Sequence, residues 1–96
     1  MTILKVSSSS RTTSVAGAIA GMMRDNQKVE LLSIGAGAAH IAVKAIAMAR
    51  RYLIGDNIAI ACVPEFETIA FDDNKERTAI KFIVFDQKEY EEPVIT

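Results

Sequence analysis

Hydrophobic residues recur with two different periods along this chain, and the change of period divides it into strands and helices. Four runs rich in β-branched and apolar residues have the length of strands: residues 2–7, 28–35, 58–63 and 77–85. Two stretches with helical spacing lie among them: residues 15–25 and 38–52. Ser14 is the expected N-cap of the first helix. The pattern predicts the order strand, helix, strand, helix, strand, strand.

The end of the chain is predicted to form a pair of strands. Pro64 either ends the strand at 58–63 or marks it as an edge strand, because proline donates no ladder hydrogen bond. Residues 66–76 are read as a polar connection with a turn at Asp73-Asn74. Alternation in the last run separates two sets of side chains: Ile80, Phe82 and Val84 on one side, and Arg77, Ala79 and Lys81 on the other.

Strands that alternate with helices favour a sheet with parallel neighbours, and a final strand pair favours an antiparallel arm. We therefore predict an α/β fold of the two-layer α+β kind, with a mixed sheet.

The helix at 38–52 carries more apolar surface than one sheet face covers. Its polar residues His40, Lys44 and Arg51 form a narrow stripe, with Arg50 beside it. One interpretation is an alanine-rich core helix. The interpretation we prefer is that a second apolar side packs on another copy of the protein, because small side chains let two helices approach closely. The predicted interface consists of Ala38, Ala42, Ala45 and Ala49.

Composition and charge indicate one globular domain with an acidic end. Half of the 96 residues are hydrophobic and 24% are charged. The net charge of −1 gives no general attraction to nucleic acid or to acidic membranes. Residues 86–96 hold four acidic side chains and one basic one, whereas the rest of the chain holds 10 basic and 8 acidic ones. We predict a domain over residues 1–85 and an acidic tail over residues 86–96.

Cysteine content and the lengths of apolar runs bear on the cellular setting. Cys62 is the only cysteine, which excludes an internal disulfide and a cysteine zinc cluster. The start of the chain has no basic-then-apolar signal pattern, and no apolar run approaches the roughly 18 residues that cross a bilayer. We expect a cytoplasmic protein without a membrane partner.

Two strand-to-helix junctions contain residues that bind anions in other proteins. The stretch "GAGAAH" (35–40) resembles the dinucleotide-binding fingerprint, but His40 replaces its third glycine and the chain is too short for two nucleotide-binding halves. A tight turn is the preferred interpretation. The stretch "SSSSRTTS" (7–14) offers hydroxyls, backbone amides and Arg11 to a phosphate, or is a solvated loop with a helix cap. Both interpretations of that loop stay open.

Other residues that carry chemistry lack companions in the sequence. His40 has no partner at metal-ligand spacing, and Cys62 lies in an apolar strand, where a thiol is usually inert. No nucleophile, base and orienting group can be assembled from the pattern. We therefore expect no enzyme, no cofactor and no metal site.

Four blocks of sequence occur together in one order: "ILKVS" (3–7), "SVAGAIAG" (14–21), "IGAGAAHIAVKAIAMAR" (34–50) and "ERTAIKFIV" (76–84). With these blocks the chain resembles the stage V sporulation protein S family over roughly residues 3–85. That family in turn resembles the Alba nucleic-acid-binding proteins, which are small dimers with the element order predicted above. The resemblance implies an Alba-like fold, DNA or RNA as a partner and a homo-oligomer, either a dimer or a tetramer. In spore-forming bacteria it also implies a regulatory role in late sporulation and septation.

The resemblance suggests which residues contact phosphates. Alba proteins carry basic residues in the first strand-to-helix loop, near the start of the second helix and on the arm between the last two strands. The matching residues here are Arg11, Lys44, Lys75 and Arg77, and Lys81 is added from the strand alternation alone. Serines replace the first-loop lysines of Alba, and Ala38 replaces an arginine, which weakens the attraction to phosphates.

Two other functions stay open at this point. One is a protein-interaction scaffold that acts through an oligomer surface and the acidic tail, without nucleic acid. The other is a binder of small anions or nucleotides at the helix turns.

Overall fold

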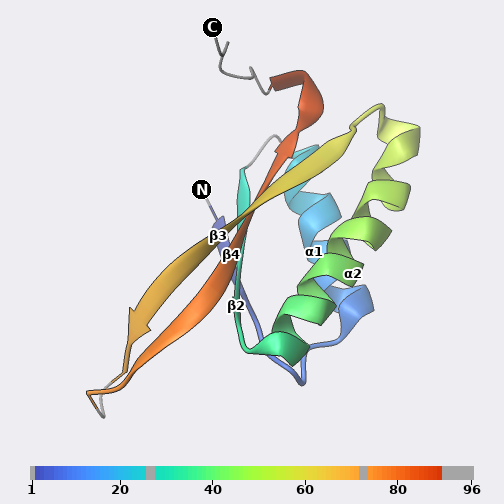
Figure 1. The fold of residues 1–96 in the computed structure, drawn as a ribbon. Coiled ribbons are helices and arrows are strands. Elements are labelled where there is room, and N and C mark those ends of the chain that lie inside the picture. The colour runs from blue at the N-terminus through green and yellow to red at the C-terminus, as the bar shows by residue number, and fades with distance from the viewer. Residues whose placement is uncertain (1, 26–27, 72–73, 90–96) are drawn as a thin grey trace, which may run out of the picture.

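The computed structural model describes residues 2–25, 28–71 and 74–89. They form one sheet with two helices packed on one of its faces (Figure 1). The elements follow the predicted order: β1 (Thr2–Val6), α1 (Thr12–Arg24), β2 (Val29–Ile34), α2 (Ala36–Leu53), β3 (Ile60–Ala70) and β4 (Glu76–Asp86). Short 3-10 helices follow α2 and β4, at Ile54–Asp56 and Gln87–Glu89.

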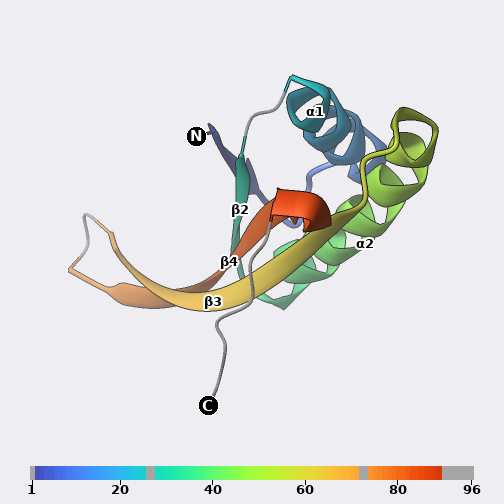
Figure 2. The same ribbon diagram turned by 90° about the horizontal axis from the view of Figure 1, so that it is seen from above.

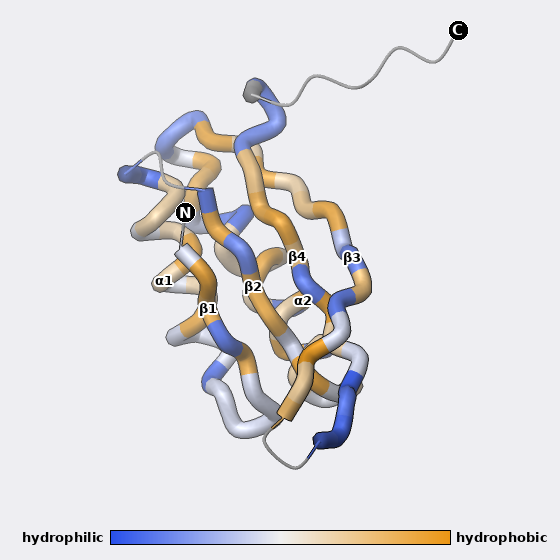
Figure 3. The backbone as a smooth tube through the Cα atoms, turned by 90° about the vertical axis from the view of Figure 1, so that its left-hand side faces the viewer, coloured by the Kyte–Doolittle hydropathy of each residue, from blue (hydrophilic) through white to orange (hydrophobic). Residues whose placement is uncertain are grey.

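The sheet is mixed, as predicted. Its strand order is β1-β2-β4-β3, in which β1 and β2 are parallel and the other two pairs are antiparallel. Both helices lie on the same side of it, and β3 and β4 extend beyond them as a curved arm (Figure 2). Among the described residues, no helix covers the opposite side, which we call the open sheet face (Figure 3). The two-layer α+β fold predicted from the alternation of periods is therefore confirmed.

Packing between the helices and the sheet forms the core. Alternate residues of β2 are buried against the helices: Val29, Leu31 and Ser33. The Ser33 hydroxyl donates to the Ile80 carbonyl at 2.9 Å, so this buried polar group is satisfied. The helices bury stripes of mostly small side chains, which permit close approach. In α1 these are Ala16, Ile19, Ala20 and Met23, and in α2 they include Ala38, Ala42, Ala45 and Ala49.

The four alanines predicted to form an oligomer interface are 0% exposed within the single chain: Ala38, Ala42, Ala45 and Ala49. They belong to the same core cluster as the buried residues of α1 and β2. They are thus unavailable to a partner subunit, and their assignment is corrected. The physical reason is that α1 covers the small-residue side of α2, so the apolar side left exposed is a different one.

Two predicted boundaries also need correction. The first helix begins at Thr12 rather than after Ser14, with Arg11 at the N-cap position and no side-chain cap hydrogen bond. Strand β3 continues to Ala70, through part of the segment predicted to be a polar connection. Pro64 lies inside it, opposite Phe82. Because β3 is an edge strand with a neighbour on one side only, the missing N–H is tolerated, which confirms the edge interpretation of Pro64.

The end of the described chain remains attached to the body. Asp86 pairs with Ile60 in the sheet, and the Gln87 N–H donates to the Ala59 carbonyl at 2.7 Å. The Lys88 Nζ donates to the Asn57 carbonyl at 2.9 Å. Most of the predicted acidic tail, residues 90–96, lies outside the described residues. Neither described helix is long and apolar enough to cross a membrane.

Candidate nucleic-acid interface

Three segments far apart in the sequence lie toward one end of the molecule (Figure 1). They are the β1–α1 loop, the start of α2 beside it and, projecting away from both, the tip of the β3–β4 arm. We call this the loop end. A Cβ added to Gly37, in the first turn of α2, would lie 3.4 Å from the Ser8 Cβ, so the loop packs directly on the helix start. The loop end therefore gathers the regions in which the sequence predicted phosphate contacts.

The serine loop is held by its own hydrogen bonds. The Ser7 N–H donates to the Ser10 Oγ at 2.9 Å, and the Ser10 N–H donates to the Ser7 carbonyl at 3.1 Å. The Ser7 and Ser9 hydroxyls are also 2.9 Å apart. These bonds give the loop a defined turn, which fixes the position from which Arg11 leaves it.

One basic side chain that the sequence pattern did not indicate borders the surroundings of both Arg11 and Arg77. Lys5 borders one hollow together with Arg11, between β1 and α1, and a second hollow together with Arg77, on the open sheet face. The Arg77 guanidinium lies 4.9 Å above the Phe71 ring centroid, a cation–π contact that holds it in place. Among the described residues, none of Lys5, Arg11 and Arg77 forms an ion pair. The period of two in a strand places Lys5 on the side of β1 away from buried Val6, and this alternation was the signal that could have identified Lys5.

The other three predicted contacts lie in different surroundings. Lys75 precedes β4 at the tip of the arm, where its carbonyl accepts from the Phe71 N–H at 3.0 Å. Lys44 is exposed on α2, in the helix layer and away from the open sheet face. Lys81 lies on the open sheet face, with its Nζ 3.8 Å from Glu65 and 3.9 Å from Glu67. Two carboxylates beside one ammonium group leave Lys81 the least suited of the five to hold a phosphate.

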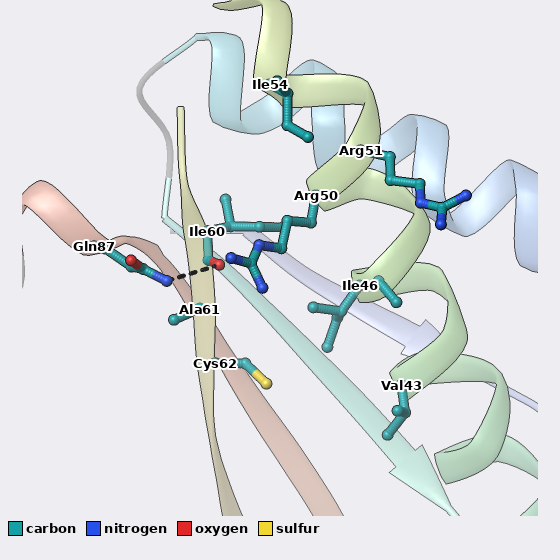
Figure 4. A pocket seen from close by; sticks show the side chains of 10 residues that line it. Val43, Ile46, Arg50, Arg51, Ile54, Ile60, Ala61, Cys62 and Gln87 are labelled. Atoms are coloured by element: carbon teal, nitrogen blue, oxygen red, sulfur yellow. Dashed lines mark hydrogen bonds between the residues drawn. The ribbon is translucent and has the colours of Figure 1, made fainter. Parts of the chain in front are cut away.

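The exposed apolar surface of α2 faces the edge strand. Val43 is 52% exposed and Ile54 is 70% exposed, and with Ile46 they face Ile60 and Cys62 of β3 (Figure 4). The space between them, which we call the α2–β3 groove, has a volume of about 600 Å³. Arg50 extends from α2 over the same groove. The excess apolar surface that the sequence indicated on α2 therefore exists, but on a different side from the buried alanines.

Cys62 should react slowly with alkylating reagents. It is half-buried on the groove side of β3, and desolvation by burial raises the pKa of its thiol. At mildly alkaline pH a smaller fraction is thiolate than in a free cysteine, and the thiolate is the reactive form. Iodoacetamide labelling of the folded protein, followed by mass spectrometry, should be slower than labelling in urea. Equal rates in the two states would contradict a shielded thiol.

Within residues 2–25, 28–71 and 74–89, no three histidine, cysteine or carboxylate side chains gather in a way that could hold a metal ion. The arrangement that remains is basic side chains at the loop end, an open sheet face and an apolar groove at the sheet edge.

Comparison with known proteins places this arrangement in a class. The structure superposes on Alba from Thermoplasma volcanium with a TM-score of 0.61 at 17% sequence identity, covering 86% of this chain and 98% of that one. This similarity shows that the fold is Alba-like. A sequence profile of stage V sporulation protein S matches residues 2–87. The chain belongs to the stage V sporulation protein S family, as its four sequence blocks predict.

Proposed function

We propose that this protein is a nucleic-acid-binding regulator that contacts phosphates as a homo-oligomer, linked in spore-forming bacteria to late sporulation and septation. The observation that carries the proposal is the cluster of Lys5, Arg11 and Arg77, cations from three separate segments with no ion pair among the described residues. Membership of the sporulation family and the Alba-like fold support it. Several basic side chains toward one end of a molecule are the electrostatic footprint of phosphate binding.

The chemistry favours contacts to the backbone of the nucleic acid over reading of its bases. Lysine and arginine bind phosphate oxygens and release counterions, which supplies affinity without sequence information. Lys75 precedes β4 on the same arm that carries Arg77. One chain offers few such groups, so assembly of several copies would multiply the contacts of each complex.

The α2–β3 groove is the surface we propose for that assembly, with a second copy of the chain as its occupant. Val43 and Ile54 expose apolar side chains to water in the single chain, which is unfavourable unless a partner covers them. They border β3 on the edge that no other described strand covers, so the surface combines apolar side chains with the backbone of an edge strand. A two-fold axis at this edge would cover both copies of the groove at once, which is how symmetric dimers bury an apolar face.

Removing the positive charges of the arm should weaken binding to nucleic acids of every sequence to a similar extent. Replacing Lys75 and Arg77 together by glutamine removes two phosphate contacts, so affinity at low salt should fall about tenfold and the salt slope should flatten by about two. Fluorescence anisotropy with labelled nucleic acid across a salt series measures both quantities.

The matched control removes two charges from the opposite end of the fold. Arg24 ends α1 and Lys28 precedes β2, and replacing both by glutamine should leave the salt slope close to that of the parent. If the arm variant folds and keeps the parent's affinity and slope, the protein-interaction scaffold becomes the better proposal.

A further inference from the structure

The open sheet face contains a pocket at the loop end that phosphate contacts alone do not explain. We call it the loop-end pocket, and its volume is about 510 Å³. Its lining combines two cations with apolar side chains: Lys5, Arg77, Leu32, Ile34, Ile69 and Phe71. Ser7 and Ser8 of the β1–α1 loop close one side. A volume in this range is that of small-molecule sites, which are mostly apolar with a few polar groups that fix orientation.

Strand register builds this pocket. Leu32 and Ile34 point away from the helices because the alternate residues of β2 are buried against them. Lys5 of β1 lies opposite Leu32, and Ala79 of β4 lies opposite Ile34. Ala79 is only 1% exposed, so the side chains around it cover it, and it is not part of the pocket lining. Arg77, two residues before Ala79 and opposite Ile69, projects to the same face.

The pocket therefore has an apolar floor between two cations carried by different strands. The Phe71 ring holds the Arg77 guanidinium from one side. Glu65 and Glu67 of β3 also lie on this face, within 4 Å of the Lys81 ammonium, which offsets part of their charge. A ligand that matches this lining has a flat apolar part for the floor and an anionic group for the two cations.

We propose that the loop-end pocket holds one unstacked nucleotide of a single-stranded nucleic acid, with the base on the apolar floor and the phosphate between Lys5 and Arg77. The inference rests on the proposed function and adds a strand preference to it. In a duplex the bases are stacked and paired, so none is free to enter a pocket, whereas a single strand presents unstacked bases to apolar and aromatic side chains.

A substitution that leaves the net charge unchanged distinguishes binding in the pocket from general electrostatic attraction to phosphates. Replacing Ile69 by glutamine polarises the floor without changing net charge. Affinity for a single strand should fall about fivefold or more, while affinity for a duplex of the same sequence changes less than about twofold. Ile3→Gln is the control, because Ile3 is an exposed isoleucine on the same face outside the pocket. Equal losses on single strand and duplex, or no loss on either, would overturn the proposal.

Nuclear magnetic resonance of the unaltered protein tests the pocket without relying on any variant. Adenosine 5′-monophosphate should shift the methyl signals of Leu32, Ile34 and Ile69 more than adenosine or inorganic phosphate does. No shift at these methyl groups, or the same shift with inorganic phosphate, would overturn a nucleotide pocket.

The two measurements together distinguish the possible failures. If the protein binds both single strand and duplex, and Ile69→Gln binds them with the parent's affinities, the proposed function stands and the pocket is overturned. If adenosine 5′-monophosphate shifts the methyl signals but the protein binds neither single strand nor duplex, the proposed function and the strand preference are both overturned. The pocket is then a site for a free nucleotide.

Discussion

Replacing Ala45 by glutamate is expected to prevent folding. Ala45 is 0% exposed in the middle of α2, within the core cluster shared with α1 and β2. A glutamate there must displace packed neighbours and bury a carboxylate without a partner, which costs at least about 4 kcal/mol. A domain of this size has a total stability of about 5–15 kcal/mol. Circular dichroism and urea unfolding should show an unfolded or strongly destabilised chain.

Ala47→Glu is the matched control for this prediction. Ala47 lies on the same helix two residues further on, where it is exposed and borders the α2–β3 groove. The substitution is chemically identical, so helix propensity changes equally and only burial differs. A folded Ala47→Glu beside an unfolded Ala45→Glu would establish which side of α2 faces the core. Equal stabilities would contradict the buried position of Ala45.

Replacing Val43 by glutamate should dissociate the proposed oligomer into monomers while the chain stays folded. Val43 is half-exposed in the single chain, so the substitution costs the monomer little stability. A symmetric interface would bury two glutamates, one from each copy. Loss of a central apolar contact costs about 2 kcal/mol or more in each copy, about 4 kcal/mol for a symmetric pair, so the dissociation constant should rise by roughly several hundredfold or more. Light scattering over a concentration series measures the mass, and the melting curve checks the fold.

Ile3→Glu provides the control on the other side of the molecule. Ile3 is an exposed apolar residue on the open sheet face, and its substitution should leave the mass unchanged. The opposite result, with Ile3→Glu monomeric and Val43→Glu still assembled, would place the interface on the open sheet face. A monomeric Val43→Glu should also bind nucleic acid more weakly, because the contacts of several copies no longer act together.

The order of elements followed from the sequence because it depends on local pattern. Alternation in residues 77–85 and helical spacing in 38–52 are properties of neighbouring residues, and they predicted β4 and α2 to within two residues at each end. Pro64 shows where such reasoning stops. A proline either ends a central strand or lies within an edge strand. Only the position of β3 at the edge of the sheet, beside β4, decided between these two interpretations.

The apolar excess of α2 was likewise evident from the sequence, but its outward side was not. A helix presents small and large apolar residues on different sides, and local spacing does not say which of them a second helix will cover. In the tertiary structure α1 packs on α2, Ala42 and Ala45 are buried in the core, and Val43 is left at the edge of β3. The family resemblance supplied the fold, whereas the choice of exposed side came from packing between distant segments.

The candidate site depends most on tertiary structure. Lys81 looked like a surface cation in its own strand, yet the register of β3 against β4 sets Glu65 and Glu67 beside it. Lys5 and Arg77 are separated by most of the chain and border one pocket, because β2 lies between the strand that carries one and the strand that carries the other. The sequence by itself determined the elements, their order and the family, since these depend on local periods and on matching blocks of residues. Which charges are paired, and which side chains meet, depended on strand register and layer packing, because these join residues that no local pattern connects.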